Sequence, residues 1–180
     1  MARSAQGPFS GTRGAVLAIV VLALAALAAA WLDVPPPPVS GQAQVSDGDS
    51  FRLGEDRIRL LGLDAPELSQ TCTDAVGASW PCGGVARDRM SDLLKSGTIT
   101  CKPEENDRYG RLLARCEIRS KDLGATMVAE GLAIASGDYG AEEAAARAAR
   151  LGIWAGGFTL PRDWRDDHPR PAGLLSWLGL

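Results

Sequence analysis

Four carboxylate side chains lie in two short clusters in the first half of the chain. Asp47 and Asp49 are separated by one glycine, so an extended backbone points both side chains the same way. Asp64 and Glu67 follow an apolar run and flank Pro66, which ends a strand because its ring fixes φ. Hard cations such as calcium bind several oxygen ligands of this kind. The clusters therefore predict a metal site, although an Asp-Gly-Asp sequence alone also occurs in ordinary turns.

Arginines and a tyrosine complete a set of residues suited to phosphoryl chemistry. Arg59 stands inside an otherwise apolar run, where a buried guanidinium needs an anion and an exposed one reaches out to water. Arg108, Tyr109 and Arg111 lie in a charged turn, for which a plain solvated loop is the alternative. With the carboxylates, these residues provide ligands for a metal, guanidinium forks for a phosphate and a base for water. The combination favours hydrolysis of phosphate esters.

The residues of this set fall on strands and turns of a small α+β fold. Strand-like alternation runs through 41–63, with turn signals between the apolar stretches. Two more strand-like segments flank the turn that contains Tyr109, and three other segments have helical spacing of apolar residues. We predict a small, curled antiparallel barrel with helices beside it. The remaining segments are strands at 98–102 and 112–118, a loop at 68–82, and helices at 84–95, 122–132 and 141–151.

The N-terminal segment has the pattern of an export signal. Residues 14–32 carry no charge and are almost wholly apolar, and Arg3 and Arg13 precede them. The run is also long enough to span a bilayer, so a cleaved signal and a retained membrane anchor both stay open. Either would place the rest of the chain beyond the cytoplasmic membrane, anchored and facing the periplasm or exterior, or secreted. The predicted organisation is a signal or anchor at 1–33, a proline-rich linker at 34–40, one domain at 41–160 and a tail at 161–180.

The four cysteines fit two disulfides better than a zinc site. No pair has the C-x-x-C spacing of zinc ligands, and the one histidine, His168, is far away in the sequence. Cys101 and Cys116 are placed symmetrically about the predicted hairpin turn, so they face each other within disulfide range. Cys72 and Cys82 would then close a short loop, as is common in exported proteins. Four free thiols are the alternative.

The overall charge is acidic. The chain has 19 Lys and Arg against 22 Asp and Glu, for a formal net charge of −3. This balance argues against a protein that binds nucleic acid tightly and non-specifically through a basic surface. It is compatible with an enzyme that holds a few phosphates at one cationic site.

Three sequence strings resemble a known family. VSDGDSFRL, RIRLLGLDAPE and DRYGR stand in the order and at the spacing found in the thermonuclease (staphylococcal nuclease-like) family. The resemblance runs from about residue 45 to 154. It implies a five-stranded OB-fold barrel with about three helices. It further implies a monomeric, calcium-dependent nuclease that hydrolyses single-stranded or denatured DNA and RNA.

The resemblance also implies a role for each matching residue. Glu67 would orient or deprotonate the attacking water, and Arg59 and Arg111 would clamp the phosphate. The calcium ligands would be Asp49, Asp64 and the backbone carbonyl of Ala65, with Asp47 in the outer shell. Nucleic acid would contact Arg108, Tyr109 and Tyr139.

Two features of the chain oppose this interpretation. Gly137 stands where the family has an aromatic residue that supports a base, so we expect looser substrate binding. Arg59 and Asp64 would be roughly 16 Å apart along a straight strand, so only the resemblance brings them together. A non-catalytic OB-fold module that binds nucleic acid or protein is the main alternative, which the missing aromatic residue and the acidic balance favour, and a structural envelope protein is another.

Overall fold

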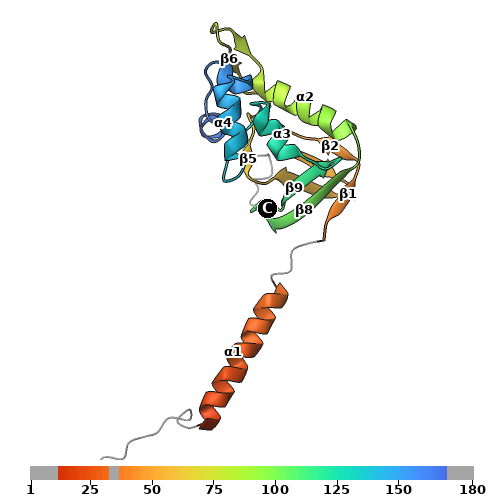
Figure 1. Cartoon of the computed structure of the whole chain (residues 1–180), viewed down its shortest axis with the longest axis vertical. Coiled ribbons are helices and arrows are strands. Elements are labelled where there is room, and N and C mark those ends of the chain that lie inside the picture. Colours follow the sequence, from red (N-terminus) through yellow and green to blue (C-terminus); the bar gives the residue numbers. More distant parts are fainter. Residues whose placement is uncertain (1–11, 33–36, 170–180) are drawn as a thin grey trace, which may run out of the picture. The chain divides into compact units, whose positions relative to one another are not determined.

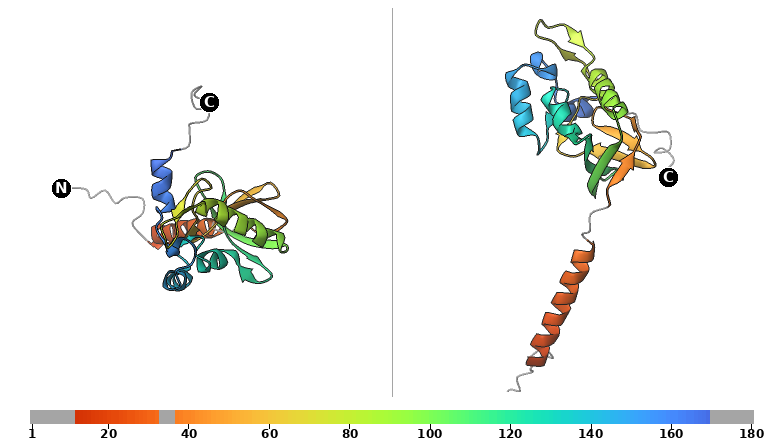
Figure 2. Two further views of the ribbon diagram at one scale, coloured as in Figure 1. Left: turned by 90° about the horizontal axis from the view of Figure 1, so that it is seen from above. Right: turned by 45° about the vertical axis from the view of Figure 1, so that its right-hand side comes forward.

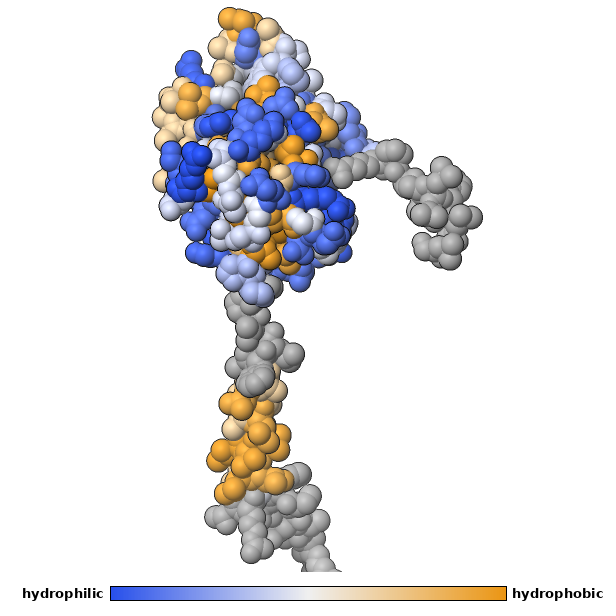
Figure 3. All heavy atoms as spheres, turned by 90° about the vertical axis from the view of Figure 1, so that its right-hand side faces the viewer, coloured by the Kyte–Doolittle hydropathy of each residue, from blue (hydrophilic) through white to orange (hydrophobic). Residues whose placement is uncertain are grey.

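The computed structural model describes residues 12–32 and 37–169, and the chain divides into two units between Pro35 and Pro36. In the first unit, one helix is described, α1 (Thr12–Leu32), in the predicted apolar segment (Figure 1). Its large side chains from Val16 to Leu27 are apolar and exposed, and they form the apolar surface of this helix seen in Figure 3. For this segment the sequence left open a cleaved signal and a retained membrane anchor. Among residues 12–32 and 37–169, no helix has both the length and the apolar character that a membrane crossing requires.

The second unit is built around a sheet that curls back on itself. Its strand order is β1-β8-β9-β4-β3-β2, and only Gln42 separates β1 from β2. This one bent segment pairs with β8 and with β3, which nearly closes the sheet into a barrel. Counting β1 and β2 as one strand gives the five strands expected of an OB-fold barrel. The strands are β1 (Val39–Gly41), β2 (Ala43–Val45), β3 (Ser50–Leu53), β4 (Asp56–Leu60), β8 (Ile99–Asn106) and β9 (Leu112–Ile118).

One pair of strands departs from the predicted antiparallel barrel. β4 runs parallel to β9, so Arg59 lies opposite Leu113. Ile58 and Leu60 are buried in the core on either side of Arg59 in the sequence. Because side chains alternate along a strand, Arg59 points away from that core. Arg111, two residues before Leu113, is thereby brought to the same region of the barrel.

Helices cover the barrel where it carries apolar side chains. α2 packs along β2 and buries Ala86, Met90 and Leu94, while α3 packs against β9 and α4 (Figure 2). α3 ends at Ala129, earlier than predicted, because Gly131 has a φ of 68° and turns the chain away. The bounds are α2 (Cys82–Lys95), α3 (Leu123–Ala129), α4 (Gly140–Ala148), the 3-10 helix η1 (Gly152–Ala155) and α5 (Pro161–Asp167).

Segments predicted as linker, loop and tail contain regular structure. The linker of 34–40 includes the start of β1, and the loop of 68–82 contains a small hairpin. The predicted tail begins with α5, where Pro161 occupies a first-turn position that suits its fixed φ. The hairpin and the other short strands are β6 (Cys72–Thr73), β7 (Ser79–Trp80), β5 (Leu63–Asp64), β11 (Ile134–Ala135) and β10 (Lys121–Asp122).

Both predicted disulfides are present. Cys101 and Cys116 face each other across β8 and β9, and Cys72 is bonded to Cys82 at the start of α2. The second pair packs with Ile153 in a small core separate from that of the barrel. No cysteine is free, so neither the zinc nor the free-thiol alternative holds.

The hairpin disulfide should contribute measurably to stability. Replacing Cys101 and Cys116 together with serine should lower the free energy of unfolding by roughly 3 kcal/mol, because the bridge closes a 15-residue loop in the unfolded chain. Denaturant titration of the oxidised wild type and the double variant measures this difference. Equal midpoints for the two proteins would contradict it.

Candidate active site

Two of the predicted metal ligands meet on one arginine nitrogen. Arg59 Nη2 lies 2.8 Å from Asp49 Oδ2 and 2.6 Å from Asp64 Oδ1. The register of β3 and β4 pairs Arg59 with Ser50, which places it next to Asp49. Gly62, with a φ of 81°, then turns the chain back, so Asp64 returns to the arginine that precedes it. The separation expected of a straight strand is thus removed by a turn.

Asp49 is held in a closely packed and buried environment. Its residue is only 5 % exposed, and burial raises the pKa of its carboxyl to about 6. Arg59 and the backbone N–H of Ala65 act in the opposite direction, while the charge of Asp64 raises the pKa further. The preceding Gly48 permits this packing, because a Cβ there would lie 2.8 Å from the Cβ of Ala65. Because burial destabilises the ionised form of this carboxyl, an additional cation that binds beside it would stabilise that form.

The donor set fits a hard cation such as calcium. Asp49 and Asp64 supply carboxylate oxygens that converge on one point, and calcium prefers such ligands. Within the residues that the structure describes, no three His, Cys, Asp or Glu side chains gather as a metal cluster. A calcium ion here would therefore need backbone oxygens, water or substrate as further ligands. The predicted use of the Ala65 carbonyl is consistent with that requirement.

Glu67, the predicted base, sits on a loop that is fixed from two sides. The buried amide of Gln70 accepts a hydrogen bond from Glu67 N at 3.1 Å, and Gln70 N donates to Glu67 O at 2.7 Å. Gly83, in the first turn of α2, packs so closely that a Cβ would lie 1.7 Å from Glu67 O. These contacts hold the loop beside Asp64.

A second arginine, missed in the sequence, reaches the same carboxylates. Arg165 of α5 lies with Nη2 2.9 Å from Asp64 Oδ2 and with Nη1 3.1 Å from Asp64 Oδ1. The same Nη1 is 2.9 Å from Glu67 Oε1. These carboxylates raise the pKa of Arg165. The one sequence signal for it was Pro161, which marks a helix start inside the presumed tail.

The hairpin tip presents the other predicted residues. Arg111 Nε pairs with Asp107 Oδ2 at 2.7 Å, and Asp107 Oδ1 accepts hydrogen bonds from the backbone N–H groups of Tyr109 and Arg111. Burial works against ionisation of Asp107, but these hydrogen bonds outweigh it and lower its pKa to about 2. The exposed Tyr109 ring has the guanidiniums of Arg108 and Arg111 at 4.8 and 5.7 Å from its centre. The tip is therefore a cationic surface with an exposed aromatic ring.

Tyr139 and Asp47 take part in local contacts. The Tyr139 hydroxyl donates to Asp122 Oδ2 at 3.3 Å, and burial with the nearby Asp122 charge raises its pKa to about 12. Asp47 Oδ1 accepts from the N–H of Gly48 at 2.8 Å. Gly137 has open space where a Cβ would stand. The structure thus joins Asp49 and Asp64 through Arg59, links Glu67 to Asp64 through Arg165, and uses the Tyr139 hydroxyl in an internal contact.

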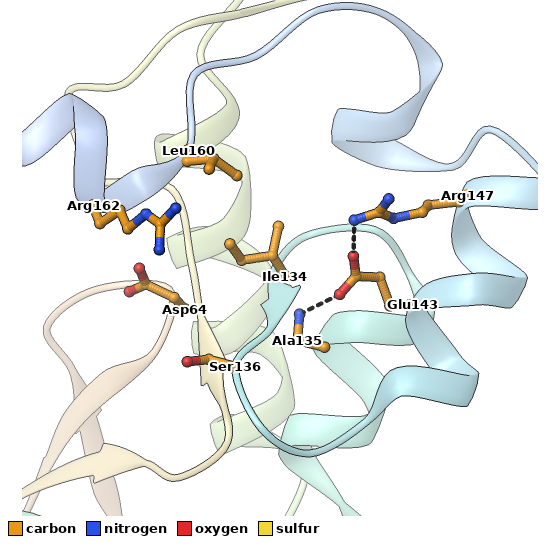
Figure 4. Close-up of a pocket in the computed structure, with 8 residues that line it drawn as sticks. All are labelled: Asp64, Ile134, Ala135, Ser136, Glu143, Arg147, Leu160 and Arg162. Carbon is orange, nitrogen blue, oxygen red and sulfur yellow. Dashed lines mark hydrogen bonds and ion pairs between the residues drawn. The ribbon is translucent and has the colours of Figure 1, made fainter.

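A pocket of about 250 Å³ opens beside Asp64. Ile134 and Leu160 form apolar walls, and Arg147 and Arg162 add positive charge (Figure 4). Figure 4 shows the Arg162 side chain directed toward Asp64. The volume lies just below the range of about 300–1,000 Å³ typical of ligand pockets. The hollow therefore suits a small group next to the carboxylates.

Comparisons with known proteins agree with this geometry. Residues 57–156 match the family described as "Staphylococcal nuclease homologue". The chain is 33% identical to "Succinoglycan biosynthesis protein ExoI" of Rhizobium meliloti, over 79% of this chain and 75% of that protein. It is 31% identical to "Micrococcal nuclease" of Shigella flexneri, over 78% and 84%. "Endonuclease YncB" of Bacillus subtilis is 28% identical, over 61% and 58%.

A barrel that brings carboxylates and arginines to one point, in a chain with endonuclease relatives, defines a nuclease, a hydrolase of nucleic acid. The chain belongs to the staphylococcal nuclease homologue family, whose matching segment includes Arg59, Asp64, Glu67 and Arg111. The resemblance stated from three sequence strings is thereby confirmed.

The raised pKa of Asp49 predicts a pH-dependent cost to stability. A carboxyl whose pKa is higher in the folded state stabilises the fold below its unfolded pKa of 3.8, and this contribution is lost as pH rises through about 6. Relative to Asp49→Asn, the wild type should lose up to about 3 kcal/mol of unfolding free energy between pH 4 and 7. Denaturant titrations in chelator across this range measure it. A difference that does not vary with pH would show the prediction to be wrong.

Proposed function

We propose that this nuclease is exported, depends on calcium, acts as a monomer and cleaves single-stranded or denatured DNA and RNA. The observation that carries the proposal is the convergence of Asp49 and Asp64 on one nitrogen of Arg59. Two carboxylates that together bind one positively charged nitrogen can also bind a cation of higher charge there. Glu67 lies beside them, joined to Asp64 through Arg165.

In this mechanism calcium, held by Asp49, Asp64 and the Ala65 carbonyl, would supply positive charge next to the reacting phosphate. Asp47 would lie outside the ligand shell. Binding of the phosphate and activation of the water would be carried out by side chains of this chain.

Arg59 and Arg111 would bind the non-bridging oxygens of the phosphate. Their planar forks match two phosphate oxygens at once and are best used when charge builds up in the five-coordinate transition state. Arg59 is held by carboxylates and Arg111 by Asp107, so an incoming phosphate exchanges one anionic partner for another. Arg108, Tyr109 and Tyr139 would contact neighbouring nucleotides. Tyr109 has the best access because its ring is exposed.

Glu67 would orient the attacking water and accept its proton. The water oxygen then bonds to phosphorus and the bond to the 5′ oxygen breaks. The departing oxygen takes up a proton from solvent water, which leaves a 3′-phosphate and a 5′-hydroxyl. The fixed loop around Glu67 suits this role, because a base must stay within hydrogen-bond reach of the water. Products with 5′-phosphate ends would contradict this direction of cleavage.

A second candidate function is a non-catalytic module that binds nucleic acid or protein. It is favoured by the open position at Gly137 and by the Tyr139 hydroxyl, which is engaged with Asp122. Both features weaken the support for a stacked base, which contributes about 1–3 kcal/mol per base. Cleavage assays separate the two candidates directly.

Cleavage by the purified full-length chain should require calcium. We expect single-stranded DNA and RNA to be cleaved with calcium and to stay intact with chelator. Arg59→Ala, Arg111→Ala and Glu67→Ala should each lower the rate by at least about 100-fold, the scale of losing one transition-state contact. Arg89→Ala is the control, since it removes an arginine that pairs with Glu130 instead of with a carboxylate of the proposed site.

Melting curves must accompany these rates. A variant that loses activity and also its cooperative melting transition would point to a structural role for that residue. No calcium-dependent cleavage by the wild type, at any neutral or alkaline pH, would support the binding module instead.

Export can be tested in cells. Its support is the pair of disulfides, which form in oxidising compartments, and the apolar N-terminal segment. We expect fractionation to find the full chain beyond the cytoplasmic membrane with no reactive thiol. A chain that starts after residue 33 should stay in the cytoplasm with four reactive thiols. Recovery of the full chain from the cytoplasm would contradict export.

A further inference from the structure

α5 carries Arg165 to the carboxylates of the proposed reaction centre. Both terminal nitrogens of its guanidinium donate hydrogen bonds to Asp64, and Nη1 also donates to Glu67. The donor–acceptor distances are 2.9 to 3.1 Å. A guanidinium that is bidentate on one carboxylate and also reaches a second sets the position of both. Arg165 lies beyond residue 156, where the match to the family ends.

The segment that leads into α5 is fastened to the loop that carries Glu67. The side-chain amide of Gln70, which is fully buried, donates from Nε2 to Thr159 O at 2.7 Å. The same amide accepts from Glu67 N through its Oε1. One buried side chain thus fixes both the backbone of Glu67 and the entry to α5. Pro161, also buried, begins the helix three residues before Trp164 and four before Arg165.

We propose that Arg165 is a positioning residue of this nuclease, which holds the Glu67 carboxylate at a set place beside Asp64. The proposal rests on the proposed function, in which Glu67 receives the proton of the attacking water. Arg165 acts through Glu67. Without the bridge, the Glu67 carboxylate is held less firmly beside Asp64, and the fraction of time it spends in reach of the water falls.

Stability has to be measured alongside turnover. The Arg165 side chain is 37% exposed, but the side chains of Asp64 and Glu67 are only 12% and 15% exposed, so removal of the positive charge would cost stability. Arg165→Lys keeps that charge, and its Tm should lie within about 3 °C of that of the wild type. A loss of turnover without a loss of stability is what distinguishes positioning from support of the fold.

The charge of Arg165 gives a second, opposite effect. A guanidinium that shares Asp64 with calcium repels the ion, so its removal should tighten calcium binding. Damage to the site as a whole would weaken calcium binding and turnover together. Positioning by a cation predicts that the two change in opposite directions.

The test compares Arg165→Ala and Arg165→Lys with the full-length wild type. Steady-state cleavage of single-stranded DNA gives kcat and KM, and titration calorimetry without DNA gives calcium affinity. For Arg165→Ala we expect kcat to fall about 10- to 100-fold, as is usual for partners of active-site ligands. KM should stay within about twofold, and calcium affinity should rise at least about threefold. Low concentrations of guanidinium ion should restore part of kcat.

Arg165→Lys separates charge from geometry. An ammonium supplies the charge but not the planar fork, so calcium affinity should return toward that of the wild type while kcat stays low. Arg89→Ala is the matched control. Arg89 is bidentate on Glu130, at 2.7 and 2.6 Å, and its side chain is 39% exposed. It should change neither quantity.

Several results would overturn the proposal. They are an unchanged kcat in Arg165→Ala, a rise in KM alone, which would show direct contact with DNA, and weaker calcium binding together with lower kcat. If Arg165→Ala does not fold, Arg165→Lys decides, because a wild-type kcat there would leave the fork without a role. A wild type that does not cleave with calcium would fail the proposed function itself, before any variant is compared.

Discussion

A single nitrogen of Arg59 joins two carboxylates, one from the bend before β3 and one from β5. Burial of carboxylates costs free energy, and it raises the pKa of Asp49 even with the guanidinium alongside. Buried carboxylates of this kind need cations in contact with them. Much of the surrounding fold serves this requirement. The pairing of β3 with β4 places Asp49 next to Arg59, and the turn at Gly62 returns Asp64 to it.

The same requirement accounts for the second guanidinium. Asp49, Asp64 and Glu67 form a region of concentrated negative charge, and Arg59 alone cannot neutralise all three. Arg165 adds a second positive charge, which still leaves one negative charge in excess, and Gln70 holds the segment that leads into its helix. A metal ion or substrate phosphate would therefore enter a site in which each of these carboxylates already contacts a guanidinium. Binding would exchange one partner for another.

The sequence predicted the parts of the fold that depend on local pattern. Alternating apolar residues indicated the strands, helical spacing located α2 and α4, and the symmetry of Cys101 and Cys116 about a turn predicted their disulfide. The closure of the sheet, in which β1 pairs with β8 and β2 pairs with β3, was not predictable from local pattern because it depends on pairings between distant segments.

The candidate site was predictable only in part, for the same reason. Spacing alone separated Arg59 from Asp64, and it was the family resemblance that joined them. Arg165 contacts Asp64 across 101 residues, and no periodic pattern encodes such a contact. Tyr139 shows that residue type can also mislead. An aromatic ring fits a stacking role, but in the structure the Tyr139 hydroxyl donates a hydrogen bond to Asp122.

The bent strand around Gln42 has a consequence for how the two ends of the catalytic unit tolerate trimming. Unpaired strand edges attract other strands and promote aggregation. Because β1 covers β8 and β2 covers β3, removal of this one segment would expose two edges at once. Removal of α5 at the other end would leave every barrel pairing in place. A protease that cuts within this segment would therefore threaten the solubility of the unit, whereas a cut before α5 would remove Arg165 and leave the strand pairings of the barrel unchanged.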